Sequence, residues 1–238
     1  MENWKMRTTA LLGEQAMQRL AKAKVAVFGL GGVGGHAVEA LARGGIGTLH
    51  LFDGDDISET NLNRQLAATI DTIGRDKAEV LAQRCLQIAP GIDVHAHRVF
   101  YLPETADSIP LDDFDYIIDA VDTVSAKLEL IERAYRANVP IICAMGCGNK
   151  LDPTAFRVAD LFETKTDPLA RVLRREVKKR GIVRLKVVYS EEMPRTPCGE
   201  TEQKGTAGRS APASVSFVPG VAGMILAGEV IKDLAKIR

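Results

Sequence analysis

The most constraining feature of this sequence is a glycine-rich segment that follows a short apolar run. Val25 to Phe28 have the β-branched and aromatic bias of a buried strand. Five glycines follow, namely Gly29, Gly31, Gly32, Gly34 and Gly35. Residues 37–42 are then good helix formers. A strand, a glycine turn and a helix in this order predict a phosphate-binding loop, because backbone N–H groups without a nearby Cβ can reach a phosphate. The motif therefore indicates a nucleotide, without saying which one.

Length and composition limit the classes that remain. The chain of 238 residues is long enough for one α/β domain with a substantial core. Its 31 Lys and Arg balance 31 Asp and Glu, so any contact with a nucleic acid would need a local basic patch. We find no signal-peptide pattern and no apolar run long enough to cross a bilayer, and we expect no membrane partner.

The cysteines argue against two common kinds of small site. The four of them, Cys85, Cys143, Cys147 and Cys198, include no C-x-x-C pair. We therefore expect a reduced, cytoplasmic protein with neither a disulfide framework nor a structural zinc.

Asp53 ends the next expected strand, residues 48–53. It lies 24 residues after Gly29, near where a dinucleotide-binding fold places the carboxylate that binds ribose hydroxyls. We predict that role for Asp53, and the simpler alternative is an ordinary aspartate at a strand end.

The polar segment 55–65 carries a second cluster. In a helix, Asn61, Arg64 and Gln65 would share one face and could converge on a triphosphate; the alternative is a capped surface turn. Lys77 lies in the first turn of the amphipathic helix expected over residues 74–89. A cation there opposes the helix dipole, so it indicates a bound phosphate nearby or a solvated lysine.

A fourth expected strand runs into a loop with Asp119 and Asp122. Because ligands of open α/β sheets lie beyond the carboxyl ends of the strands, we expect Asp122 near the glycine loop, as a Mg²⁺ ligand. On the strand expected over residues 92–100, His95 and His97 share a face, and we interpret them as structural or solvated rather than metal-binding.

Beyond Lys150 the βα alternation stops. We expect a strand over residues 156–162, a helix over 168–180 and an edge strand over 184–190. Residues 191–212 are rich in Pro, Gly and charged residues and predict a mobile loop that could act as a lid. A last helix over residues 214–233 is rich in small residues, which would let it pack closely on the sheet or on a second subunit.

The segment 171–186 is basic. It holds eight Lys and Arg and the single acid Glu176. Two interpretations remain open, a solvated basic face and a contact with RNA phosphates.

Taken together, several motifs resemble those of the ubiquitin-activating-enzyme superfamily, in particular its MoeB/ThiF/HesA group. They are Gly29-x-Gly-Gly-x-Gly34, Asp53-x-Asp55, Asn61-Leu-Asn-Arg-Gln65, Lys77 and Asp119-Ala-Val-Asp122. The resemblance implies a doubly wound, Rossmann-like, mainly parallel sheet with an antiparallel C-terminal extension. It also implies one adenylating domain over residues 1–238, with a nucleotide-binding half (22–150) and a substrate and dimerisation half (151–238).

The resemblance further implies Mg-ATP as the bound nucleotide, adenylation of a carboxylate, and a homodimer. It assigns the ribose to Asp53, the phosphates to Asn61, Arg64 and Lys77, and the magnesium to Asp122. Arg7 resembles an arginine that such dimers lend to the neighbouring subunit's site. The implied nucleotide contacts are Gly29, Gly31, Gly32, Gly34, Asp53, Asp55, Asn61, Arg64, Gln65, Lys77 and Asp122.

The chain lacks the two zinc-binding C-x-x-C pairs of MoeB and ThiF. Together with Gly13-Glu-Gln-Ala16 and the C-terminal Ser216-Phe-Val-Pro-Gly-Val-Ala-Gly223, this resembles the family of tRNA threonylcarbamoyladenosine dehydratases. The resemblance implies ATP-dependent cyclisation of threonylcarbamoyladenosine in tRNA. It leaves open a monovalent cation near the last helix and a cysteine desulfurase as a sulfur-mobilising partner.

Two other functions compete. An activator of a ubiquitin-like sulfur-carrier protein would share most of these motifs. An NAD-binding redox protein would explain the glycines and Asp53 but not Arg64, Lys77 and Asp122. A thioester on Cys147 or Cys198 is not required, because an acyl-adenylate can be attacked by a group of the same substrate.

Overall fold

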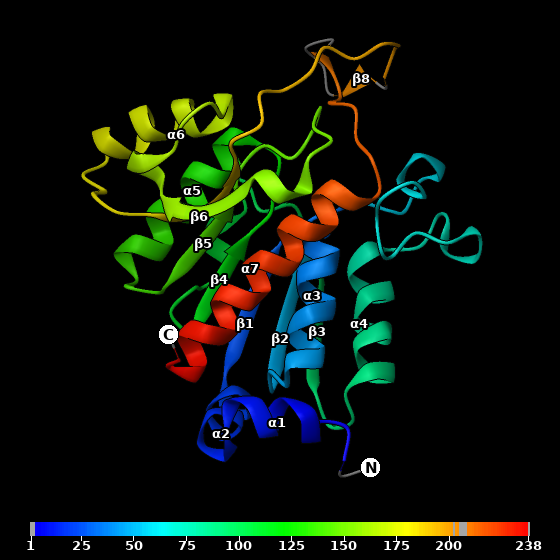
Figure 1. Cartoon of the computed structure of the whole chain (residues 1–238), viewed down its shortest axis with the longest axis vertical. Coiled ribbons are helices and arrows are strands. Elements are labelled where there is room, and N and C mark those ends of the chain that lie inside the picture. The colour runs from blue at the N-terminus through cyan, green and yellow to red at the C-terminus, as the bar shows by residue number, and fades with distance from the viewer. Residues whose placement is uncertain (1–2, 202, 205–208, 238) are drawn as a thin grey trace.

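The apolar run before the glycine loop is an inner strand of a seven-stranded sheet (Figure 1). The structure, a computed structural model, describes residues 3–201, 203–204 and 209–237. Within these residues the strand order of the sheet is β3-β2-β1-β4-β5-β7-β6. The strands are β1 (Lys24–Phe28), β2 (Thr48–Asp53), β3 (Asp93–Arg98), β4 (Tyr116–Asp119), β5 (Ile141–Ala144), β6 (Phe156–Asp160) and β7 (Lys186–Ser190). All neighbours pair in parallel except β6 and β7, which are antiparallel.

Helices cover both faces of the sheet (Figure 1). They are α1 (Met6–Leu12), α2 (Glu14–Lys22), α3 (Gly34–Gly44), α4 (Lys77–Ile88), α5 (Val124–Arg136), α6 (Pro168–Lys179) and α7 (Phe217–Ala235). Successive residues of β1 face opposite sides, as in any strand. Val25 and Val27 pack with α2, α3, α4 and α7, whereas Ala26 and Phe28 pack on the side of α5. Burial on both faces explains why β1 is apolar throughout.

Short 3₁₀ turns lie in the connections: η1 (Glu59–Asn61), η2 (Ile70–Thr72), η3 (Ala106–Ser108), η4 (Pro153–Ala155) and η5 (Leu161–Glu163). A small hairpin, β8 (Gln203–Lys204) with β9 (Arg209–Ser210), stands apart from the main sheet. Figure 1 places it beyond the end of the sheet that carries the glycine loop. This hairpin interrupts the segment that we expected to be a loop.

The mainly parallel sheet with one antiparallel pair confirms the predicted fold class. One detail of the expected strands is wrong: residues 184–190 do not form an edge strand. β7 lies between β5 and β6, with Ile142 opposite Lys186 and Val158 opposite Val188, and it is buried along most of its length. β6 is the edge strand on this side of the sheet instead, and its partly exposed residues fit that position.

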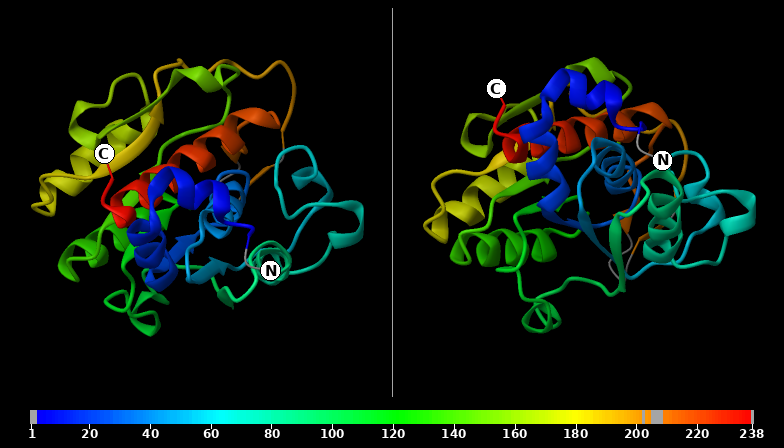
Figure 2. Two further views of the ribbon diagram at one scale, coloured as in Figure 1. Left: turned by 60° about the horizontal axis from the view of Figure 1, so that its bottom comes forward. Right: turned by 90° about the horizontal axis from the view of Figure 1, so that it is seen from below.

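The N-terminal residues 6–22 form two helices, α1 and α2. Gly13, with φ of 84°, separates α1 from α2. Both helices lie at the end of the sheet where the parallel strands begin, opposite the glycine loop (Figures 1 and 2). α2 buries Ala16, Met17 and Leu20.

The small residues of the last helix pack within the chain. A Cβ at Gly223 would lie 2.2 Å from the carbonyl oxygen of Val33, and one at Gly220 would lie 3.1 Å from the His36 ring. α7 therefore approaches the start of α3 at backbone distance. The sequence predicts the sheet or a second subunit as the partner of these residues, whereas Gly220 and Gly223 pack against the start of α3.

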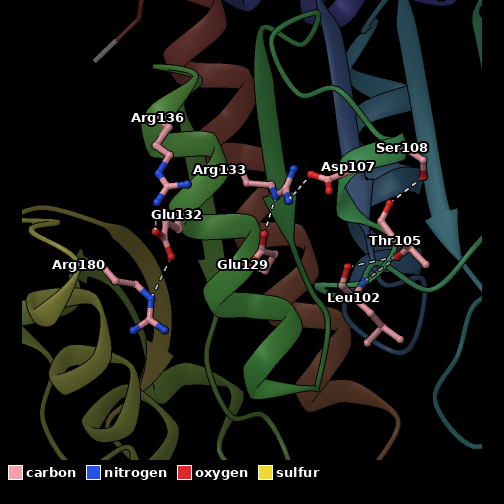
Figure 3. A network of polar contacts seen from close by, with 9 residues as sticks. All are labelled: Leu102, Thr105, Asp107, Ser108, Glu129, Glu132, Arg133, Arg136 and Arg180. Atoms are coloured by element: carbon pink, nitrogen blue, oxygen red, sulfur yellow. Dashed lines mark hydrogen bonds and ion pairs between the residues drawn. The ribbon is translucent and has the colours of Figure 1, made fainter.

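A charged network joins the crossover segment between β3 and β4 to α5 and α6 (Figure 3). Arg133 lies 2.6 Å from Glu129 and 2.7 Å from Asp107. Glu132 accepts from both Arg136 and Arg180, the residue that follows α6. Within the crossover segment, Thr105 Oγ1 accepts from the N–H of Leu102 and donates to the carbonyl oxygen of Phe100. Residues 99–102 line the cleft described below. None of the described helices is long and apolar enough to cross a membrane.

Candidate active site

A cleft of about 500 Å³ opens at the carboxyl ends of β1, β2, β4 and β5. This is the edge at which open α/β sheets bind their ligands. One wall comes from the glycine loop and the end of β2, and another from the loops after β4 and β5. Most of the predicted site residues line it: Gly29, Gly31, Gly32, Asp53, Asp55, Arg64, Gln65, Lys77 and Asp122.

The glycines of the loop have different tasks. Gly29 has φ of 84°, and a Cβ there would lie 2.6 Å from the carbonyl oxygen of Ala120. A Cβ at Gly31, which lines the cleft, would instead meet Gln65 Nε2 at an ordinary contact distance of 3.8 Å. Gly29 therefore serves close packing between the β1 and β4 loops, while Gly31 leaves room in the cleft. The N-terminus of α3 lies directly after this loop, and its partial positive charge favours an anion.

Asp53 ties the end of β2 to the glycine loop. Its Oδ2 accepts a hydrogen bond from the backbone N–H of Leu30 at 2.7 Å, and its Oδ1 accepts from that of Asp55 at 2.9 Å. Burial raises the pKa of this carboxyl, and the positive charge of Lys77 and the two N–H donors counteract part of that rise. Each oxygen keeps a second lone pair, so the carboxylate can still accept from a ribose hydroxyl.

Lys77 is the first residue of α4 and is not a solvated lysine. Its side chain is 6% exposed, and Nζ lies 2.9 Å from Oδ2 of Asp55, which is 54% exposed. Asp76 caps α4 by accepting from the N–H of Glu79. The carboxylate of Asp55 is largely hydrated, so it neutralises the charge of the Lys77 ammonium only in part. The remaining positive charge attracts an anionic ligand in the cleft.

The segment with Asn61, Arg64 and Gln65 is not an α-helix. It is the turn η1 followed by irregular turns, so the three side chains do not share a helix face. Asn61 is buried and accepts from the N–H of Ser58, which is the capped-turn alternative for that residue. Arg64 donates to the carbonyl oxygen of Thr60 and to Asn63.

Gln65 nevertheless behaves as a ligand-binding residue would. It is buried and lines the cleft, and its Oε1 has no hydrogen-bond partner within the described part of the chain. A buried amide oxygen without a partner is costly. A ligand or an ordered water would satisfy it.

The loop after β4 carries Asp119 and Asp122 in different environments. Asp122 lines the cleft, and Thr123 Oγ1 lies 3.4 Å from its Oδ1. Asp119 is fully buried, accepts from the N–H of Val121 at 3.1 Å, and pairs with Lys127 of α5 at 2.9 Å. Among the described residues there is no group of three or more His, Cys, Asp or Glu side chains that could hold a metal on its own.

The loop after β5 closes the far wall, through residues 145–148. Lys150 holds this loop from behind: Nζ donates to the carbonyl oxygen of Gly146 at 2.6 Å and lies 3.3 Å from Asp167. Asp167 also caps α6 through the N–H of Ala170. The cleft wall and the start of α6 are thus connected through one buried ion pair.

The segment above the cleft is anchored to the same loop. Asn149 donates its backbone N–H to the carbonyl oxygen of Ala213, and its side chain accepts from the N–H of Ala213. Residues 211, 212 and 214 line the cleft. This places the end of the expected lid, residues 191–212, at the site, and its mobility stays a prediction.

Cys147 and Cys198 lie in unlike settings. Cys147 lines the cleft, and burial raises the pKa of its thiol to about 12. Cys198 is exposed, in the segment above the cleft. A thiol with such a raised pKa is protonated at neutral pH and is a weak nucleophile.

Two further predictions concern regions outside the cleft. Arg7 is exposed on α1, at the opposite end of the sheet from the cleft (Figure 1). In the basic segment, Lys186 pairs with Glu229 and Asp233, and Arg174 donates to Thr164. The exposed cations of α6 are Arg171, Arg175, Lys178 and Lys179.

Sequence reasoning missed Lys127, which lines the cleft from α5. The same signal that drew attention to Lys77 was available, since Lys127 also stands in the first turns of a helix that follows a strand. Phe100 was missed too. Its ring lies against Gly54, where a Cβ would approach it to 2.5 Å, and it is half exposed at the cleft.

The fold and the cleft define a Rossmann-like protein built to hold a nucleotide at the carboxyl edge of its sheet. The chain belongs to the ThiF family, whose model matches residues 5–238.

Its relatives narrow the comparison. A curated protein of Bacillus subtilis (strain 168), named tRNA threonylcarbamoyladenosine dehydratase, is 40% identical over 238 residues, which cover 97% of this chain and 94% of that protein. The crystal structure of Escherichia coli tRNA N6-threonylcarbamoyladenosine dehydratase, TcdA, in complex with AMP has a TM-score of 0.89 at 34% identity, covering 99% of this chain and 96% of the other. Its complex with ATP has a TM-score of 0.87 with the same coverage. The predicted resemblance to this family is confirmed.

Proposed function

We propose that this chain is an ATP-dependent tRNA threonylcarbamoyladenosine dehydratase. The observation that carries the proposal is the cleft itself, in which the glycine loop, Asp53 and the buried Lys77 meet at one sheet edge. Close similarity over almost the whole chain to proteins named for this reaction supports the choice of substrate.

ATP binds with its ribose on Asp53 and its phosphates along the glycine loop. Lys77 and Arg64 neutralise the phosphate charge. Both line the cleft, and the guanidinium of Arg64 reorients from its contacts with Thr60 and Asn63. The unpartnered Oε1 of Gln65 accepts a hydrogen bond from the nucleotide. Asn61 supports the turn that carries Arg64, since it already accepts from Ser58.

Magnesium fits this site as a companion of the nucleotide. Mg²⁺ is usually held by one or two carboxylates together with substrate phosphates and water, and Asp122 offers such a carboxylate at the cleft. When bound, the ion would stabilise the negative charge of the phosphates.

The reaction has two steps. An oxygen of the threonyl carboxylate bonds to the α-phosphorus of ATP, and the bond to pyrophosphate breaks. An oxygen or nitrogen of the same substrate then loses its proton and attacks the activated acyl carbon, and AMP leaves. Because the second attack is intramolecular, its effective molarity can reach about 10⁵ M, and no enzyme nucleophile is required.

A homodimer would complete the site. Arg7 is far from the cleft of its own chain, so it can act only on a neighbouring copy. Phe217, Val221 and Met224 form an apolar stripe on the outer side of α7, with Phe217 49% and Met224 46% exposed. Such a stripe suits an interface between copies.

The exposed cations of α6 provide the local basic patch that tRNA binding needs in a chain of zero net charge. Asp167, which caps the start of α6, lies behind the cleft wall through its pairing with Lys150. A tRNA whose phosphates bind along α6 would therefore lie close to the cleft.

The test is mass spectrometry of nucleosides after incubating the protein with ATP and tRNA that carries threonylcarbamoyladenosine. We expect an ATP-dependent loss of the mass of one water from that nucleoside. Arg64→Ala, which removes a phosphate contact at the surface, should abolish pyrophosphate release while leaving thermal unfolding unchanged.

Parallel assays address the two competing functions. ATP–pyrophosphate exchange stimulated by a sulfur-carrier protein and not by this tRNA would favour the carrier-activating function. Tight binding of NADH without binding of ATP would favour a redox protein and overturn the proposal.

A further inference from the structure

Lys127 is a buried cation in the cleft to which the reaction above assigns no task. Its side chain is 1% exposed, and Nζ lies 2.9 Å from Oδ2 of the fully buried Asp119. It is nevertheless one of the residues that line the cleft. Lysine is rarely buried to this degree unless it is paired or functional.

The pairing with Asp119 does not satisfy the ammonium. An ammonium has three N–H donors. Within the described chain, neither Nζ of Lys127 nor Oδ2 of Asp119 has a hydrogen bond of acceptable geometry, although their charges are in contact. The nearby Cys143 and Cys147 offer only sulfur, a weak acceptor. An oxygen of a bound ligand would complete the coordination of Nζ.

Two buried lysines thus line the cleft, and they pair at the ends of different strands. Lys77 pairs with Asp55, which follows β2, whereas Lys127 pairs with Asp119 at the end of β4. β1 and the glycine loop lie between β2 and β4. Asp119 is opposite Cys143 of β5 in the sheet register, so the Lys127–Asp119 pair lies beside β5. One cation therefore stands at the Asp53 end of the cleft and the other at the wall formed after β5.

In adenylation, two anions lie on opposite sides of the α-phosphorus: the attacking carboxylate and the leaving pyrophosphate. Pyrophosphate leaves along the line on which the carboxylate attacks, so the two anions occupy opposite ends of the site. A carboxylate that approaches ATP without a counter-charge would be repelled by the phosphates.

We propose that Lys127 binds the substrate carboxylate and orients it against the α-phosphate, so that the β5 side of the cleft is a carboxylate subsite. This inference rests on the proposed function. In the adenylation step a carboxylate oxygen bonds to phosphorus and pyrophosphate leaves, while the ammonium keeps its protons and transfers none.

A purely structural role is the alternative. The Lys127–Asp119 pair also connects α5 to the loop that carries Asp122, and losing it could displace that loop. Lys127→Met alone would strand the buried charge of Asp119. The double variant Asp119→Asn/Lys127→Met avoids this, because the amide keeps an oxygen that can accept from the N–H of Val121.

The experiment compares wild type, Lys127→Arg, Lys127→Met and the double variant in binding to two tRNAs. One carries threonylcarbamoyladenosine with its free carboxylate, and the other carries the methyl ester of the same nucleoside. ATP affinity and thermal unfolding are measured on each protein. Dehydration by the wild type is followed in the same samples.

We expect wild type to prefer the free acid. Lys127→Met and the double variant should lose about 10- to 100-fold in affinity for the acid, with ester binding and ATP affinity unchanged. Lys127→Arg should keep part of the preference, since a guanidinium also binds carboxylates.

Equal loss for acid and ester, or a parallel loss of ATP affinity and thermal stability in the double variant, would mean that the pair is structural, and the inference would fall. If wild type dehydrates the free acid but shows no preference for it over the ester, the inference also falls while the proposed function stands. A wild type that binds ATP but converts no tRNA would overturn the proposed function first.

Discussion

Gly34 stands so close to Gly29 that a Cβ on Gly34 would lie 1.8 Å from the carbonyl oxygen of Gly29. The first turn of α3 is thereby packed onto the end of β1. The spacing of these two glycines is a requirement of the fold before it is a requirement of the ligand. Gly31, which lies between them, has no such contact.

Gly34→Ala and Gly31→Ala form a matched pair that separates the two requirements. We expect Gly34→Ala to lower stability by about 3 kcal/mol or more, because the backbone cannot yield to that overlap. Gly31→Ala should change stability by less than about 1 kcal/mol yet weaken ATP binding about tenfold, because its methyl group points into the cleft. Thermal unfolding and calorimetric titration with ATP check both. Equal effects of the two substitutions on stability would contradict this division.

Lys77→Met should weaken ATP binding about 10- to 100-fold, the expected loss for one charge-assisted contact. Losing the ion pair with Asp55 should cost no more than about 1 kcal/mol, because Asp55 is 54% exposed and stays hydrated. Asp53 also loses the positive charge that counteracts its burial, which adds to the fall in stability. The exposed Lys178 of α6 supplies the control Lys178→Met, for which we expect unchanged ATP affinity. Equal ATP affinity in the two variants would remove Lys77 from the phosphate site.

Replacing the exposed cations of α6 by Gln should weaken tRNA binding without changing ATP affinity. The four positions are Arg171, Arg175, Lys178 and Lys179. If each contacts a phosphate, the slope of log affinity against log salt should become less steep by up to about four. Filter binding at several salt concentrations measures it. Lys22→Gln/Lys236→Gln, on exposed residues elsewhere, is the control, and an equal loss in that variant would show that the effect is not local to α6.

Acidification should destabilise the protein through His50. Nδ1 of His50 lies 3.0 Å from Nε2 of His97, and its ring stacks on His95 with centroids 4.4 Å apart. Burial, together with the charges of His95, His97 and Lys24, lowers the pKa of His50 to about 4, against the opposing charge of Asp93. Burial lowers the pKa of His97 in the same direction.

The folded state therefore resists a proton that the unfolded state accepts. The free energy of unfolding should fall as the pH drops from about 6.5 toward 4. Above about pH 6.5, His50 should have no such effect, because it is neutral in both the folded and the unfolded state. His50→Phe, whose ring fits the stack with Phe52, should show a smaller fall in melting temperature between neutral pH and about pH 5. An unchanged fall would assign the acid sensitivity to other groups.

The double variant Cys147→Ser/Cys198→Ser should keep turnover within about threefold of wild type. The raised pKa of Cys147 leaves little thiolate at neutral pH, and intramolecular attack needs no thioester. Single-turnover dehydration of tRNA measures this. Complete loss of cyclisation with normal adenylation would instead establish a covalent thioester intermediate.

Local sequence was informative where a residue's role depends on its own backbone. The apolar pattern and the glycines after it predicted the strand before Gly29. The spacing from Gly29 predicted the role of Asp53 at the end of β2, and the helix dipole indicated the role of Lys77 at the start of α4. Asn61, Arg64 and Gln65 could not, because a helix and a turn place the same residues on different faces. The position of β7 inside the sheet was equally hidden, since it depends on pairing with β5 and β6, which are distant in sequence.

By itself, then, the sequence determined a nucleotide-binding α/β fold and most of the residues at its phosphate end, because these lie within a few residues of recognisable strand and helix ends. Only the tertiary structure decided which polar residues are buried together. Lys127 meets Asp119, and Lys150 meets Asp167, through packing between elements that sequence spacing does not relate. Burial makes those pairs consequential, because a charge removed from water must find its partner, or its ligand, within the fold.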